Sequence, residues 1–237
     1  MKKTLLSSRW LLRLSRMTNF PWRHPRQATI KVNRGCNSLC VYCYAWKEQS
    51  PKKEAPLASL LRIIEELAEF GIENISFTGG EPLMRPDIEQ MADQAKRSGI
   101  HTGVITNGLL LTPERYDALY ASGVRYFNIS LDTIDPAIYR LLRGVPLERV
   151  LRNLLSASQK IQVSGDAFIS LLCVVSRLNL SMLPELAYFA YKNNVRLMLQ
   201  PIQSVTSLPK NRTDEHLQPW QFGPDDLPWV QDAIENL

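Results

Sequence analysis

The chain has 237 residues, of which 45% are hydrophobic and 22% are charged, and its formal net charge is +5. This composition excludes a disordered protein, and the length suits one domain with a sizeable core. Four cysteines are too few for the dense disulfide framework of a small secreted protein. We therefore expect a cytoplasmic protein, in which clustered cysteines bind a metal or take part in redox chemistry.

The positive charge is concentrated at the amino terminus. Residues 1–26 contain seven lysines and arginines and no acidic residue, whereas the other 211 residues carry 21 basic and 23 acidic groups, a net charge of −2. The arginines interrupt every apolar run before it reaches the length of a signal peptide. Leu6, Trp10, Leu14 and Met17 recur at helical spacing, which predicts a basic amphipathic arm. This arm packs on the domain, contacts a membrane surface peripherally, or binds nucleic acid.

From residue 27 onward, short β-rich runs alternate with longer runs of helical period. Six runs predict strands: 28–33, 74–78, 102–106, 126–131, 168–175 and 196–202. Between them, apolar stripes predict helices over 57–67, 88–95, 113–122, 147–160 and 184–193. This alternation predicts βα units around a parallel sheet, and six units fit either a partial barrel or an open doubly wound sheet.

The carboxyl-terminal part of the chain has a different pattern. Residues 204–237 begin with a polar, proline-rich stretch that predicts a linker, and they end in the start of a helix. We therefore divide the chain into an arm over 1–26, a core over 27–203 and this last segment.

Polar and cysteine-containing motifs follow the predicted strands. The carboxyl ends of parallel strands share one face of the fold, where such proteins place their sites. The motifs are Cys36, Cys40 and Cys43 after the first strand, TGGEP (78–82) after the second, TNG (106–108) after the third, SLD (130–132) at the end of the fourth, and Gln200 at the end of the sixth.

The three clustered cysteines have the spacing C-x3-C-x2-C, and the only other cysteine is Cys173. A structural zinc site uses four nitrogen or sulfur ligands, usually as two pairs, and here no second pair or nearby histidine follows. Short cysteine spacings also hold iron–sulfur clusters, and a four-iron cluster with three thiolates leaves one iron open for a cofactor or substrate. The alternative is a non-catalytic zinc or iron–sulfur module with Cys173 as the fourth ligand, although the apolar run ISLLCVV favours a buried core thiol there.

The segment CNSLCVYC (36–43) resembles the cluster motif of the radical S-adenosylmethionine (radical SAM) enzymes, with Tyr42 at the aromatic position before Cys43. GGEP at 79–82 is similar to the glycine-rich motif after the second strand of that family. The resemblance extends over residues 27–203 and implies an α/β fold, a partial (β/α)6 barrel of parallel strands with outer helices.

The resemblance also implies an activity. A 4Fe-4S cluster held by the three cysteines would reductively cleave S-adenosylmethionine to a 5′-deoxyadenosyl radical, which abstracts hydrogen from a substrate. An electron donor of the flavodoxin or ferredoxin type is implied as a partner. The sequence leaves open whether the substrate is a small molecule, a peptide, a lipid or RNA, and it does not indicate the oligomeric state.

The same resemblance assigns cofactor-binding roles to further residues. Gly79 and Gly80 would let the backbone approach the methionine amino group, and Tyr42 would lie against the adenine. The remaining candidates are Glu81, Pro82, Thr106, Asn107, Ser130, Asp132, Arg143 and Gln200. For Thr106 and Asn107 the alternative is a simple turn, and for Arg143 it is a solvated helix end. Many family members that modify peptides carry a cysteine-rich carboxyl-terminal extension, but no cysteine follows Cys173 here, which predicts a single-cluster protein or a piece of a longer one.

Overall fold

The computed structural model describes residues 13, 16–18, 25–43, 45, 54–202 and 221–235. Its centre is one sheet of six parallel strands that pair in chain order from β1 to β6. The strands are β1 (Gln27–Lys31), β2 (Asn74–Thr78), β3 (His101–Thr106), β4 (Val124–Ser130), β5 (Phe168–Val175) and β6 (Arg196–Pro201). Each predicted strand is confirmed, with ends that differ by two residues at most.

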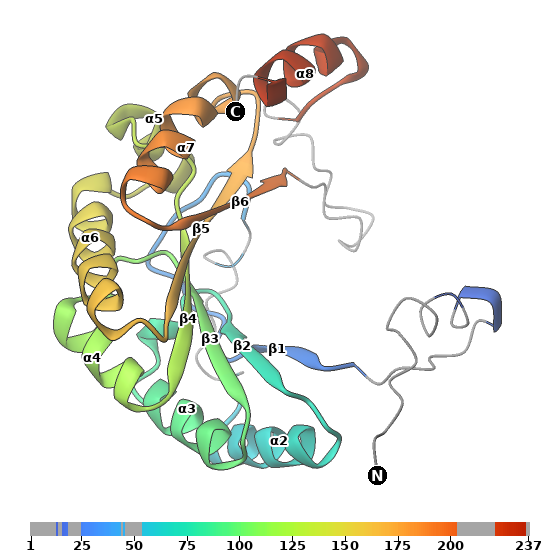
Figure 1. The fold of residues 1–237 in the computed structure, drawn as a ribbon, viewed down its shortest axis with the longest axis vertical. Helices are drawn as coiled ribbons and strands as arrows, with labels where there is room; N and C mark the ends of the chain where they lie inside the picture. Colours follow the sequence, from blue (N-terminus) through green and yellow to red (C-terminus); the bar gives the residue numbers. More distant parts are fainter. Residues whose placement is uncertain are drawn as a thin grey trace.

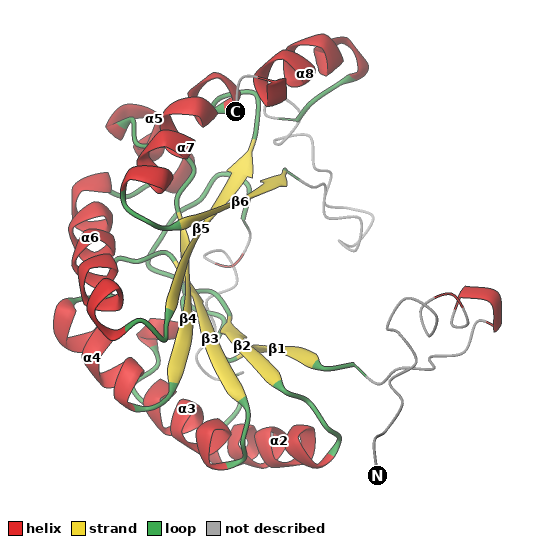
Figure 2. Ribbon diagram, viewed as in Figure 1, coloured by secondary structure: helices red, strands yellow, loops and turns green. Residues whose placement is uncertain are grey.

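The connecting helices lie on the outer, convex side of this curved sheet (Figure 1). They are α2 (Leu57–Glu69), α3 (Ile88–Arg97), α4 (Pro113–Ala121), α5 (Pro136–Arg143), α6 (Leu147–Ser164) and α7 (Leu183–Lys192), with the 3-10 turns η3 (Pro82–Met84) and η4 (Leu180–Met182). After the last strand come the 3-10 turn η6 (Pro224–Asp226) and helix α8 (Leu227–Glu235). Sequential strand order and helices on one side confirm the partial (β/α)6 barrel, because a doubly wound sheet has helices on both faces (Figure 2).

The core fills the space between the sheet and the outer helices. Alternate residues of each strand point toward the helices, as in the fully buried Phe77 and Phe127. The apolar stripes predicted from sequence meet them, for example through Ile64 of α2 and Met91 of α3, neither of which is exposed. The opposite, concave face of the sheet is turned away from these helices (Figure 1).

One helix was missing from the sequence prediction. Helix α5 has only eight residues, so it is too short for a clear apolar period. Its signals are local: Asp135 caps it by accepting the N–H of Ile138, Pro136 stands at its first turn, and Gly144 ends it in the left-handed conformation with φ 68°. These caps place Arg143 at the last turn, directly beside the cysteine loop.

Two predicted segments fall largely outside the described residues. Most of the arm over 1–26 is not described, and neither is the linker stretch 203–220, so the predictions for them are not tested. The helix expected near the carboxyl terminus is α8. Among the described helices, none has the length and apolar character needed to cross a bilayer.

Phe127→Ala tests the packing of β4 on the outer helices. Phe127 is fully buried and its ring centroid lies 4.8 Å from that of Tyr116 in α4. We expect the substitution to lower the free energy of unfolding by about 3–5 kcal/mol, because it removes a ring and leaves a cavity. In the same urea titrations, Tyr191→Ala, at a side chain 83% exposed on α7, should stay within about 0.5 kcal/mol of wild type. Equal effects of the two changes would contradict this packing.

Candidate functional site

The loop that carries the three cysteines is held at the carboxyl edge of the sheet by the turn after β2. Backbone hydrogen bonds run from Gly80 N–H to the carbonyl of Asn33 and from Glu81 N–H to that of Gly35. In the opposite direction, Nδ2 of Asn33 donates a hydrogen bond of 2.7 Å to the carbonyl of Glu81. The motif GGEP and the start of the cysteine loop therefore form one hydrogen-bonded unit.

Gly79 and Gly80 are required for this contact. A Cβ on Gly79 would lie 2.1 Å from Oδ1 of Asn33, and one on Gly80 would lie 2.1 Å from the carbonyl oxygen of Gly35. Neither approach is possible for a residue with a side chain. The structure thus gives these glycines a role that the sequence did not suggest: they admit the cysteine loop to the sheet edge.

Glu81 is a buried carboxylate whose oxygens are used within the chain. Oε1 accepts the hydroxyl of Thr106 at 2.7 Å and the N–H of Leu83 at 3.1 Å, and Oε2 accepts the N–H of Asn107 at 2.7 Å. Burial raises the pKa of Glu81, while these hydrogen bonds act in the opposite direction. Glu81 and Thr106 therefore join the end of β2 to the end of β3.

Asn107 connects β3 to the cysteine loop. Its Nδ2 donates to Oδ1 of Asn37 at 2.6 Å and lies 3.9 Å from Sγ of Cys36, and its Oδ1 accepts the N–H of Leu109. This amide thus does more than form the turn, because it also reaches the first cysteine.

On the other side of the loop, Asp132 and Arg143 form a buried ion pair. The guanidinium donates from Nε to Oδ2 at 2.6 Å and from Nη2 to Oδ1 at 2.7 Å. Tyr42 donates its hydroxyl to Oδ2 at 2.5 Å, and burial raises the pKa of this tyrosine, which keeps the hydroxyl protonated. Nη1 of Arg143 lies 3.9 Å from Sγ of Cys40. Arg143 pairs a carboxylate as its resemblance implied, but that carboxylate belongs to the chain itself.

The three thiols differ in burial. Cys40 is 7% exposed, and its burial raises the pKa of the thiol to about 11 against the opposing effect of Arg143. Cys36 and Cys43 are half-buried, and their sulfurs accept the N–H groups of Ser38 and Ala45, each at 3.4 Å. Each sulfur thus has an N–H donor aimed at it.

These donors fit the thiolates of an iron–sulfur cluster, whose sulfurs typically accept hydrogen bonds. Ser38, between the first two cysteines, is 1% exposed, and its Oγ has no partner among the described residues, so a cluster sulfur would give it an acceptor. Within the described part of the chain, no three Cys, His, Asp or Glu side chains converge on a single metal position.

Cys173 lies in the core of β5. Its thiol donates to the carbonyl of Asp132 at 3.5 Å and accepts the Asn179 side chain at 3.6 Å. Burial raises its pKa strongly. These are the contacts of a core thiol, which the sequence favoured over a fourth ligand.

The remaining predicted residues spread over the same edge. Pro82 is buried at the first position of η3. Ser130 is half-buried at the end of β4 and pairs with Leu172, whereas Gln200 is exposed on β6 opposite Val174. Neither polar side chain has a hydrogen bond with another described residue, so both are available to a ligand.

The sequence reasoning missed Arg85. Its guanidinium donates to the carbonyl oxygens of Val32 and Ala55 at 2.9 and 3.0 Å and makes two bonds of 2.7 Å to Asp87. It therefore fixes the chain just before the cysteine loop. The only sequence signal for this role was the position of Arg85 three residues after GGEP. The carbonyl groups of Val32 and Ala55, which it binds, are distant in sequence.

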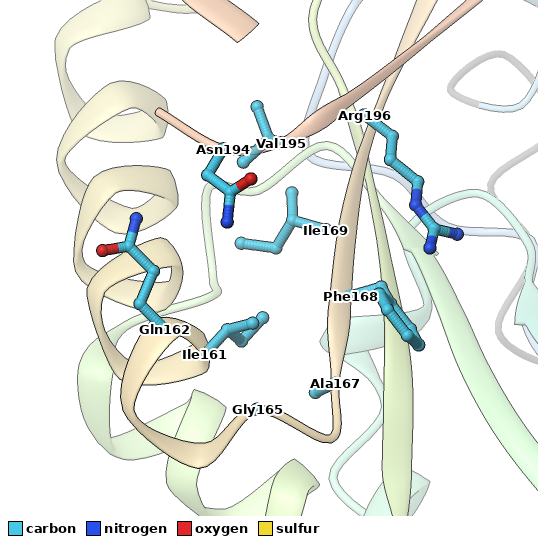
Figure 3. A pocket seen from close by; sticks show the side chains of 9 residues that line it. All are labelled: Ile161, Gln162, Gly165, Ala167, Phe168, Ile169, Asn194, Val195 and Arg196. Atoms are coloured by element: carbon cyan, nitrogen blue, oxygen red, sulfur yellow. The ribbon is translucent and has the colours of Figure 1, made fainter. Parts of the chain in front are cut away.

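A separate hollow of about 360 Å³ lies at the amino ends of β5 and β6, beside α6 (Figure 3). Gly165, Asn194 and Val195 belong to its wall. Since the cysteines follow the carboxyl end of β1, this hollow lies at the opposite edge of the sheet and is not part of the candidate site.

Comparison with known proteins gives a consistent result. The family model of the radical SAM superfamily matches residues 30–190. A probable GTP 3′,8-cyclase of Methanopyrus kandleri is 36% identical over 120 residues, which cover 51% of this chain and 38% of the relative. The PqqA peptide cyclase of Gluconobacter oxydans is 28% identical over 163 residues, covering 68% of this chain and 45% of the relative. The chain thus spans less than half the length of these curated relatives.

Solved structures share the fold. The Streptococcus suis protein SuiB, in a crystal structure with bound S-adenosylmethionine, superimposes with a TM-score of 0.72 at 20% identity, covering 96% of this chain and 51% of SuiB. The structure of anSMEcpe with bound AdoMet and a peptide gives a TM-score of 0.69 at 18% identity, and the match covers 89% of this chain and 59% of anSMEcpe. At these identities the likeness supports the fold alone.

Arg143→Met tests the buried ion pair. It leaves the Asp132 carboxylate buried without its counter-charge, so we expect the free energy of unfolding to fall by about 3–5 kcal/mol. The double variant Asp132→Asn/Arg143→Met removes both charges but keeps an amide that can pair with the Tyr42 hydroxyl and the Val174 N–H, so it should be less destabilised than Arg143→Met alone. Urea titrations of the three proteins give the comparison. A double variant less stable than the single one would contradict the role given to the pair.

The Arg85–Asp87 pair predicts a pH dependence. Hydrogen bonding to Arg85 lowers the pKa of Asp87 below its unfolded value near 3.8. Its stabilisation is therefore complete above about pH 4 and is lost as the pH falls through the folded pKa. We expect Asp87→Asn to be less stable than wild type at pH 6, with a difference that shrinks toward pH 2.5. A difference independent of pH, in urea titrations across this range, would show that the charge of Asp87 does not matter.

Proposed function

Because the chain belongs to the radical SAM superfamily, we propose that it is the core domain of a radical SAM enzyme. The observation that carries the proposal is the cysteine loop, in which three thiols lie at the carboxyl edge of the sheet, each with an N–H donor on its sulfur. Enzymes of this superfamily use a 4Fe-4S cluster and S-adenosylmethionine. When bound and reduced, this pair supplies a 5′-deoxyadenosyl radical that abstracts a hydrogen atom from a substrate.

Cys36, Cys40 and Cys43 would hold the cluster. The N–H groups directed at their sulfurs stabilise negative charge, which increases when a cluster is reduced. Arg143 adds a full positive charge beside Cys40. These donors would stabilise the thiolates once iron binds, whereas in the chain without iron burial raises the pKa of the Cys36 and Cys40 thiols.

The candidate cofactor residues divide into two groups by their contacts. Glu81, Thr106, Asp132 and Arg143 use their polar groups within the chain, so we assign them the positioning of the loops. Ser130 and Gln200 have free polar groups beside the same edge, and we assign them direct contact with S-adenosylmethionine or the substrate. Asn107 belongs to both groups, because it lies against the first cysteine and also closes its own turn.

The partners follow from the chemistry. Reduction of the cluster requires a low-potential donor, for which we propose a flavodoxin or ferredoxin, and a reduced iron–sulfur protein suits the reducing cytoplasm. One structural relative is described with its precursor peptide bound, and curated relatives include cyclases of GTP. A peptide or a nucleotide-like small molecule is therefore favoured over a lipid.

The test is the cleavage of S-adenosylmethionine by the anaerobically reconstituted chain with dithionite. We expect about four irons per wild-type chain and formation of 5′-deoxyadenosine, detected by liquid chromatography and mass spectrometry. Cys40→Ala should lose both, because it removes a cluster ligand.

Cys173→Ala is the matched control, since it removes a thiol that lies in the core. It should keep both the iron and the cleavage activity. Loss of iron in Cys173→Ala, together with no cleavage by wild type, would instead support the alternative of a non-catalytic zinc or iron–sulfur module in which Cys173 is the fourth ligand.

A further inference from the structure

The concave face of the sheet carries polar side chains that the candidate site does not use. Alternation along the strands places them on the side opposite the helices. Their polar groups have no hydrogen-bond partner among the described residues, and they are Gln27, Thr29, Asn74, Ser76, Tyr126, Asn128 and Ser170. Unused hydrogen-bond capacity on a concave surface is typical of a ligand site.

Part of this face forms a pocket of about 240 Å³ over β1 and β2. The strand register sets its floor: Gln27 lies opposite Asn74, and Thr29 lies opposite Ser76. Two side-chain amides and two hydroxyls thus stand in pairs on adjacent strands, and Tyr126 of β4 forms the wall. The lining contains no charged side chain.

A local irregularity brings Tyr126 to this pocket. In the pairing of β3 with β4, Thr102 lies opposite Val124 but Gly103 lies opposite Tyr126, so Arg125 is an extra residue. A bulge of one residue reverses the face on which the next side chain stands, which turns Tyr126 inward.

Gly103 makes room for the Tyr126 side chain, because a Cβ on residue 103 would lie 2.9 Å from the Cβ of Tyr126. The space between Ser76 and Tyr126 consequently stays open, since the strand between them carries no side chain at this level.

The ring of Tyr126 is held from its other side. It stacks on Phe168 at a centroid distance of 5.9 Å and an interplanar angle of 15°, and the Arg196 guanidinium lies 4.3 Å from the Phe168 centroid. Figure 3 shows Phe168 and Arg196 pointing to the same side of β5, away from α6. This stack fixes the tyrosine ring as a rigid wall of the pocket.

These features match one ligand chemistry. The lining offers no charged partner to a ligand, so its side-chain amides and hydroxyls would have to recognise the ligand by hydrogen bonds. Side-chain amides both donate and accept, and Asn and Gln read the edges of nucleobases in this way, while tyrosine rings stack on their faces. The volume of about 240 Å³ has room for a nucleobase.

We propose that this pocket binds the base of a nucleoside or nucleotide substrate. The proposal rests on the proposed function and names its substrate class. Ser76 lies three residues before Gly79, a distance of about 10 Å along the strand. The pocket begins at the amino ends of β1 and β2, where Gln27 and Asn74 lie. A base held between Ser76 and Tyr126 would therefore direct its sugar along the strands toward the carboxyl edge, where the cysteine loop lies.

The experiment measures binding of guanosine and cytidine to the anaerobically reconstituted full chain by calorimetry. Saturating S-adenosylmethionine is present throughout, so that the cofactor's own adenosine site is filled. We expect wild type to bind at least one of the two nucleosides.

Two variants alter the pocket. Ser76→Leu fills it and Tyr126→Ala removes its wall, and each should weaken nucleoside binding at least tenfold. Ser59→Leu on α2 and Tyr188→Ala on α7 make the same changes at exposed positions and should leave binding within twofold of wild type. Two independent pocket variants keep the test valid if one of them folds poorly.

Absence of binding to both nucleosides, or binding insensitive to both pocket variants, would overturn the proposal. A second result would also overturn it: the uncharged peptide N-acetyl-dialanine amide binds, the pocket variants weaken its binding, and neither nucleoside binds. The formation of 5′-deoxyadenosine from the cofactor separates this proposal from the one on which it rests. Wild type that forms 5′-deoxyadenosine but binds neither nucleoside refutes the substrate class alone, whereas nucleoside binding without cleavage refutes the proposed function.

Discussion

The Asp132 carboxylate is the point at which the cysteine loop is attached to the barrel. It accepts two hydrogen bonds from Arg143 of α5, one from the Tyr42 hydroxyl in the cysteine loop and one from the N–H of Val174 in β5. Four segments of the chain therefore meet at one buried group. Because a buried charge without these partners is costly, any displacement of the loop carries a large free-energy penalty. This constraint keeps the thiols in place while they bind iron and change charge.

Glu81 has the corresponding position on the other side of the loop. It joins β2 to β3 as Asp132 joins β4 to β5, and neither carboxylate is left free for a ligand. The cysteine loop lies between these two anchors. Positive or N–H groups from both sides, Arg143 at Cys40 and Asn107 at Cys36, point at its sulfurs. The arrangement is that of a preorganised metal-binding loop supported by a second layer of side chains.

Local patterns in the sequence were sufficient for the fold. Alternating β-rich and helical runs predicted all six strands, and the motifs after the strands predicted which residues gather at one edge. The contacts of individual side chains were not predictable in this way. Nothing in the local sequence indicated that the oxygens of Glu81 and Asp132 accept hydrogen bonds from donors 25 and 42 residues away. Such pairings depend on which strands become neighbours. Helix α5 and the bulge at Arg125 were missed because each depends on one or two residues rather than on a repeated pattern.

We propose that the three cysteines hold a four-iron cluster with one iron open to S-adenosylmethionine. The electron paramagnetic resonance spectrum of the anaerobically reconstituted, dithionite-reduced chain, recorded with and without that cofactor, tests this proposal. We expect the signal of a reduced 4Fe-4S cluster whose shape changes when S-adenosylmethionine is added, because the cofactor binds the open iron. A cluster signal that is the same in both spectra, or a reconstituted chain that holds no cluster, would contradict it.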